Sequence, residues 1–100
     1  MAYVRISLMR PKRGQEQRLT DLIDQLAAYY RQQPGFLNGY RLSALPGDTS
    51  GRLGRVGVWE SAAAAERAAG TDHDLALRSE VNMAVEDGSH EELAFEGVLV

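Results

Sequence analysis

Cysteine is absent from the 100-residue sequence, and histidine and tryptophan are scarce, with two copies and one copy. The absence of cysteine excludes disulfide bonds, thiolate nucleophiles and thiolate-bound metal ions. The two histidines, His73 and His90, are too few and too far apart in the chain to form a closed zinc site. The glycines form no phosphate-binding motif, because Gly51-Arg-Leu-Gly54 lacks the flanking residues of nucleotide-binding loops. We therefore expect no metal and no other cofactor.

Positive charge and long apolar runs are lacking as well. The net charge is −3 and the isoelectric point about 5.3, so no overall positive field would attract nucleic acid or an anionic membrane. No apolar run approaches the roughly 18 residues of a membrane-spanning helix, and the N-terminus lacks the apolar core of a signal peptide. We expect a cytoplasmic protein that forms a single domain over residues 1–100.

Alternating apolar residues predict four strands. Residues 3–10 alternate between two faces, one with Val4, Ile6 and Leu8 and the other with Tyr3, Arg5, Ser7 and Met9. Further strands are predicted over residues 36–45, 53–59 and 91–100. In the second of the four, Gly39 suggests a bulge, and one face is expected to hold Phe36, Tyr40 and Leu42.

Apolar residues at three- and four-residue steps predict helices between these strands. The first covers residues 15–32 and ends before Pro34-Gly35, because proline cannot continue the helical hydrogen bonds. Ser61 is a candidate N-cap for an alanine-rich helix that breaks at Gly70, and Asp72 is a candidate cap for the helix that follows. The alanines either let their helix approach the sheet closely or leave space that a ligand fills.

The predicted order of elements is β-α-β-β-α-β, with the second helix broken. This order indicates an α+β, ferredoxin-like fold, in which a four-stranded antiparallel sheet carries its helices on one face. The other face would then expose more apolar surface than a monomer usually does. We expect a homodimer in which two sheets pack face to face.

Three stretches of the sequence resemble a known family. They are Pro34-Gly-Phe-Leu-Asn-Gly-Tyr40, the strand end Val58-Trp-Glu-Ser61, and Gly70-Thr-Asp-His73. Together they are similar to the antibiotic biosynthesis monooxygenase-like proteins, which are dimeric α/β barrels. The resemblance implies a small cavity in each subunit and, among known activities, cofactor-independent monooxygenation of a small aromatic or quinol-like substrate. The haem-degrading branch is not indicated, because the alanine-rich helix has no tryptophan and residues 78–85 have no histidine.

Four residues are candidates for a site in such a cavity. His73 matches a histidine often found where the family's last helix begins, and it would act as a general base or simply cap that helix. Trp59 would either wall the pocket or pack in the core. Tyr40 is a further substrate-binding candidate, and Arg5 would either line the cavity or pair with a carboxylate across the dimer. His90 is expected to be a solvated turn residue. The alternative to an enzyme is a non-catalytic dimer that binds a small ligand or has a structural role.

Overall fold

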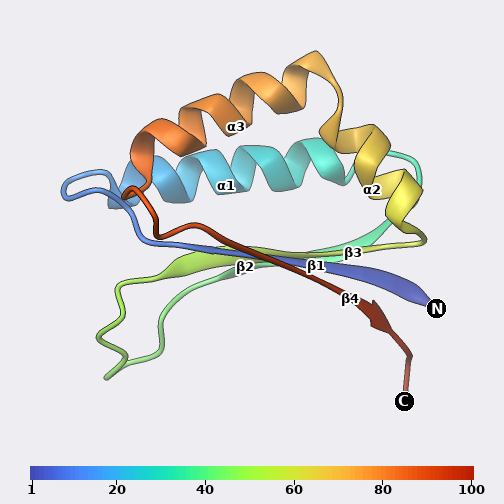
Figure 1. Cartoon of the computed structure of the whole chain (residues 1–100), viewed down its shortest axis with the longest axis horizontal. Coiled ribbons are helices and arrows are strands. Elements are labelled where there is room, and N and C mark those ends of the chain that lie inside the picture. Colours follow the sequence, from blue (N-terminus) through green and yellow to red (C-terminus); the bar gives the residue numbers. More distant parts are fainter.

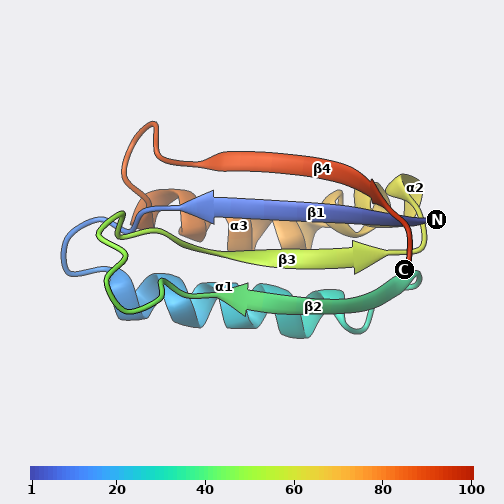
Figure 2. The same cartoon turned by 90° about the horizontal axis from the view of Figure 1, so that it is seen from below.

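The computed structural model describes all 100 residues, and it contains four strands and three helices. Their order is β1 (Ala2–Met9), α1 (Glu16–Tyr30), β2 (Phe36–Leu42), β3 (Leu53–Trp59), α2 (Ala62–Ala69), α3 (Asp72–Ala84) and β4 (Glu91–Gly97). All three helices lie on one side of a single sheet (Figure 1). Figure 2 shows its antiparallel strand order, β2-β3-β1-β4. The predicted ferredoxin-like α+β fold is confirmed, and no helix has the length and hydropathy needed to cross a membrane.

The sheet has one face covered by the helices, here called the helix face, and one left uncovered, the open face. On β1 the side chains that point to the helices are those of Tyr3, Arg5, Ser7 and Met9. Ser7 and Met9 are almost fully buried there. The apolar set, Val4, Ile6 and Leu8, lies on the open face and is only half-buried. The more uniformly apolar side of this strand therefore points away from the protein's own core.

The core lies between the helix face and the helices. Helix α1 buries the apolar stripe that its sequence spacing predicts: Leu19, Leu22, Ile23, Leu26 and Tyr30. Helix α3 contributes Leu77, Val81 and Ala84 to the same cluster. Burial of apolar side chains at this three- and four-residue spacing stabilises both helices, since isolated helices of this length are marginal in water.

Strand β2 differs from its prediction in the position of the bulge. The register with β3 shifts between Phe36 and Asn38, upstream of Gly39. Phe36 therefore stays on the helix face, where its ring packs edge-on against Trp59 with centroids 5.0 Å apart. Tyr40 lies opposite Val56 on the open face. The prediction that Phe36 and Tyr40 share a face is wrong, because the extra residue in the bulge reverses the alternation.

Helix α2 packs closely on the turn that precedes β2. Its N-cap is Ser61, as predicted, and the hydroxyl of Ser61 accepts a hydrogen bond from the backbone N–H of Ala64. Gly35 has φ +88°, and a Cβ added there would lie only 2.6 Å from the Cβ of Ala64. The alanines therefore permit close packing. The cap of α3 is Thr71 and not Asp72, since the Thr71 hydroxyl accepts from the N–H of Asp74.

Candidate active site

A cavity of about 290 Å³ lies between the helix face and helices α1 and α3, and we call it the inner cavity. Its apolar wall is made of Met9, Ile23, Leu26 and Val81. Its polar wall is made of Arg5, Ser7, Arg55, Arg78, Asn82, His90 and Glu92. An apolar surface that faces a few convergent polar groups is the usual character of a small-molecule site.

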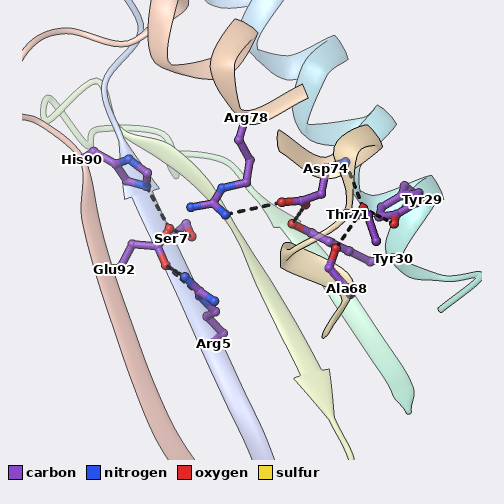
Figure 3. Close-up of polar contacts among 10 residues, drawn as sticks. All are labelled: Arg5, Ser7, Tyr29, Tyr30, Ala68, Thr71, Asp74, Arg78, His90 and Glu92. Atoms are coloured by element: carbon purple, nitrogen blue, oxygen red, sulfur yellow. Dashed lines mark hydrogen bonds and ion pairs between the residues drawn. The ribbon is translucent and has the colours of Figure 1, made fainter. Parts of the chain in front are cut away.

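Glu92 is the centre of a hydrogen-bonded cluster in the polar wall (Figure 3). It lies on β4 directly opposite Ser7 on β1, so both side chains point to the helix face. The Nε of Arg5 donates to Oε2 of Glu92 at 2.7 Å, and the Ser7 hydroxyl donates to Oε1 at 3.0 Å. The Nε2 of His90 lies 3.2 Å from the same Oε1. The carboxylate is thus held in one orientation by three partners.

The partners of Glu92 also set its pKa. Burial would raise the pKa of this carboxyl, but the hydrogen bond and positive charge of Arg5 outweigh burial and lower the pKa below its ordinary value. For Arg5, burial acts to lower the pKa, and the contact with Glu92 more than reverses this effect. Glu92 is therefore an ionised hydrogen-bond acceptor at neutral pH.

The lowered pKa makes the contribution of Glu92 to stability depend on pH. Since the folded protein binds the proton of Glu92 less tightly than the unfolded chain does, the stabilisation is present above the ordinary pKa of 4.5 and is lost as the pH falls through the folded value. We expect Glu92→Gln to be less stable than wild type at pH 7, and the difference to shrink in acid. Urea unfolding across this range measures it. Glu66→Gln, an exposed change on α2, is the control. A difference that stays constant with pH would contradict the prediction.

A second polar network lies where α1 meets the start of α3. Asp74 is fully buried, and it accepts hydrogen bonds from the Tyr30 hydroxyl and from Nη1 of Arg78, the latter at 3.4 Å. Figure 3 shows Arg78 extending from α3 into the space between this network and the Glu92 cluster. Burial raises the pKa of Tyr30; the positive charge of Arg55 opposes the shift and the contact with Asp74 adds to it. The Tyr30 hydroxyl therefore stays protonated and acts as a donor.

A second hollow, the outer groove, has a volume of about 480 Å³ and lies between α1 and strands β2 and β3. Its lining includes Tyr30, Phe36 and two glycines that face each other across the strands, Gly39 and Gly57. Ile23 and Arg55 line both the outer groove and the inner cavity. These two side chains therefore form the boundary between the two spaces.

The structure brings one of the four predicted site residues into the inner cavity. Arg5 lines it and pairs with Glu92 of the same chain. Trp59 is 3% exposed and packs against Tyr30 and Phe36 in the core. Tyr40 is 67% exposed on the open face, and it also borders the outer groove.

The remaining candidate, His73, lies on the exposed side of α3. Its ring is 4.6 Å from the ring of Tyr29, centroid to centroid, and it is not among the residues that line the inner cavity. His90 is exposed, as expected for a turn residue, and its side chain also borders the inner cavity and contacts Glu92.

Sequence reasoning missed most of the polar wall. Arg55 had only the signal of a charged residue in an otherwise apolar strand, and Arg78 and Glu92 had no signal before the packing of α3 and the register of β4 were known. Ser7 was grouped with Arg5 on one face of β1, without a role. No group of three or more His, Cys, Asp or Glu side chains is placed to hold a metal ion.

Solved structures share this fold over nearly the whole chain. SnoaB from Streptomyces nogalater, a cofactor-independent oxygenase, has a TM-score of 0.84 at 17% identity, covering 99% of this chain and 95% of its own. Rv0793 from Mycobacterium tuberculosis has a TM-score of 0.85 at 17% identity, covering 100% and 98%. A conserved protein from Methanosarcina mazei has a TM-score of 0.84 at 14% identity, covering 95% and 91%. At such identities the likeness establishes the fold.

Sequence comparison supplies the family. Among curated proteins, no sequence matches the chain. The family model described as antibiotic biosynthesis monooxygenase matches residues 1–79, from β1 into α3. The match includes the three stretches whose resemblance was noted in the sequence. The chain therefore belongs to the antibiotic biosynthesis monooxygenase family.

Proposed function

We propose that the protein is a cofactor-independent monooxygenase that oxidises a small aromatic, quinol-like substrate in the inner cavity. The observation that carries this proposal is the division of the cavity into an apolar and a polar wall. An aromatic ring would pack on the first wall, and its hydroxyl group would reach the second. Membership of the family, and the likeness to a cofactor-independent oxygenase, favour the same class of reaction.

His90 is the proposed proton acceptor. When Nε2 carries a hydrogen and donates it to Glu92, Nδ1 is left with the lone pair that can accept a proton from a substrate hydroxyl. Arg5 and Ser7 hold the Glu92 carboxylate, which in turn orients the imidazole. The guanidinium groups of the polar wall would stabilise the negative charge that develops on the substrate oxygen.

The substrate anion supplies the electrons for the reaction with O₂. Transfer of one electron gives a substrate radical and superoxide, which combine at an activated ring carbon to form a hydroperoxide. The carbon that carries the hydroperoxide keeps one hydrogen, and loss of water from it gives a carbonyl group. One oxygen atom of O₂ enters the product and the other leaves as water, so the balance needs no further reductant. The chain itself supplies proton transfer, charge stabilisation and an apolar surface for the ring.

The comparison of the two histidines tests this proposal. With simple anthrols and naphthoquinols as substrates, we expect oxygen uptake by the wild type and about 10²-fold slower uptake by His90→Gln, the lower end of general-base effects. His73→Gln should keep the wild-type rate, because His73 lies beside Tyr29 and does not line the inner cavity. An oxygen electrode with added chelator, and product analysis, give the readout.

Two other outcomes of this experiment would contradict the proposal. A loss of activity in His73→Gln alone would support the sequence-based assignment of the base and overturn that of His90. Binding of these compounds without oxygen uptake would indicate the alternative function, a non-catalytic ligand-binding dimer.

We also propose that the protein is a homodimer in which the open faces of two sheets pack together. On this face, apolar residues of neighbouring strands lie directly opposite one another: Val4, Val58 and Phe95 in one row, and Ile6, Val56 and Leu93 in the next. Phe95 is 53% exposed and Leu93 39% exposed in the single chain. Contiguous apolar surface of this kind usually marks a site of association.

A further inference from the structure

Arg55 is the cation of the inner cavity that has no carboxylate partner. Arg5 is paired with Glu92, and Arg78 is paired with Asp74. Arg55 is half-buried and forms neither an ion pair within 4.0 Å nor a side-chain hydrogen bond, in contrast to those two. Its contact is with the ring of Tyr30, whose centroid lies 5.1 Å from Cζ. A half-buried charge without an opposite charge is unfavourable unless something compensates it.

The neighbour of Arg55 in the sheet makes this arrangement more costly. Arg41 on β2 is the direct cross-strand partner of Arg55 on β3. Like charges placed directly opposite each other destabilise a sheet. Arg41 is compensated by Asp24 on α1, at 2.8 Å, whereas no acidic side chain lies within ion-pair distance of Arg55 and only the more distant charge of Glu92 acts on it. The fold therefore keeps an excess positive charge at this point of the helix face.

The position of Arg55 suggests what compensates the charge. Arg55 lines both the inner cavity and the outer groove, so a ligand in either space can reach its guanidinium group. A guanidinium group presents its N–H donors in a fork that matches the two oxygen atoms of a carboxylate. The Tyr30 ring covers one side of the group and helps to fix its orientation.

We propose that the substrate is an aromatic hydroxy acid whose carboxylate binds Arg55. The ring lies in the inner cavity, with its hydroxyl toward His90, and substituents beyond the carboxylate extend into the outer groove. This inference rests on the proposed function, because it names the class of substrate for the same cavity. It adds a preference for a substrate with a permanent negative charge, which a neutral quinol does not have.

Calorimetric titration without oxygen tests the inference separately from catalysis. The probes are 1-hydroxy-2-naphthoate, which carries a carboxylate, and 1-naphthol, which has the same rings and hydroxyl but no carboxylate. We expect the wild type to bind the acid about 10- to 100-fold more tightly than the phenol, the range expected from hydrogen bonds to charged groups. Arg55→Gln should remove this preference while the affinity for 1-naphthol stays the same.

The matched control is Arg18→Gln, which removes the same charge from the exposed face of α1, where Arg18 pairs with Glu80 away from both cavities. It should keep the preference for the acid, so a loss there would indicate an effect of net charge only and would overturn the inference. Far-UV circular dichroism and melting temperature show whether Arg55→Gln is folded. If that variant does not fold, Arg55→Lys, which keeps the charge without the fork, should lower the preference.

The two proposals fail in different ways. Equal binding of the acid and the phenol by the wild type, or an unchanged preference in Arg55→Gln, would overturn the role of Arg55. Oxygen uptake with neutral quinols would still support the monooxygenase. Conversely, tight Arg55-dependent binding of the acid, without oxygen uptake for any hydroxy acid or quinol, would support a carboxylate site and overturn the oxidative function.

Discussion

Asp74→Ala is expected to lower the free energy of unfolding by about 3 kcal/mol. The change removes the acceptor of the buried Tyr30 hydroxyl and the partner of Arg78, and it leaves a small void. A buried donor without a partner costs roughly 1–3 kcal/mol, and hydrogen bonds to charged groups contribute at the upper end of the usual range. For a domain of this size the melting temperature should fall by roughly 12–24 °C. Urea and thermal unfolding followed by circular dichroism measure both quantities.

Asp72→Ala separates the buried network from the helix dipole. Asp72 and Asp74 both lie in the first turn of α3, but Asp72 is exposed. Its removal costs only the dipole interaction, about 0.3–1 kcal/mol. Equal losses in the two variants would show that the network around Asp74 adds nothing. Tyr30→Phe, which removes only the donor hydroxyl, gives a milder second measurement should Asp74→Ala be too unstable to purify.

Ile6→Glu is expected to convert the proposed dimer into a monomer. Ile6 is in the middle of the open face, opposite Val56 on one neighbouring strand and Leu93 on the other. A carboxylate there would be buried without a partner in a sheet-to-sheet interface, at a cost of several kcal/mol. That cost raises the dissociation constant of the dimer by roughly 10³-fold or more. Sedimentation velocity or light scattering during gel filtration gives the mass.

The control for this variant is Leu75→Glu. Leu75 is 52% exposed on α3, in the helical layer, and its replacement introduces the same charge without touching the open face. It should remain a dimer. A wild type that is monomeric at micromolar concentration, or an Ile6→Glu protein of unchanged mass, would contradict sheet-to-sheet association.

Local patterns in the sequence were sufficient for most of the fold. The apolar stripe of α1, its stop before Pro34 and the Ser61 cap depend on interactions within a few residues, so spacing and residue type reveal them. The bulge after Phe36 did not follow from spacing, because the pairing with β3 determines it. Because of that single extra residue, Tyr40 lies on the open face and not, as predicted, on the same face as Phe36.

The candidate site was less predictable than the fold, because it is assembled from residues far apart in the sequence. Glu92 meets Arg5 and Ser7 only through the register of β4 on β1, and no local signal contains that register. The sequence alone assigns His90 to a turn, Gly88-Ser-His, and gives it no partner. For Arg5 the sequence left two roles open, a place in the cavity wall or a carboxylate partner across the dimer. In the structure Arg5 lines the inner cavity, and its carboxylate partner, Glu92, belongs to the same chain.

The alternation of β1 has a consequence for how this protein can change. Odd-numbered positions from Arg5 to Met9 border the inner cavity, and even-numbered positions from Val4 to Leu8 form the open face. If the inner cavity binds the proposed substrate and the open face forms the proposed dimer, substitutions at the first set alter which ligand fits, and those at the second set alter which sheet can pack on the protein. The two proposed properties, ligand choice and self-assembly, would then be free to diverge independently within one strand, whereas a one-residue insertion would exchange the two sets and abolish both together.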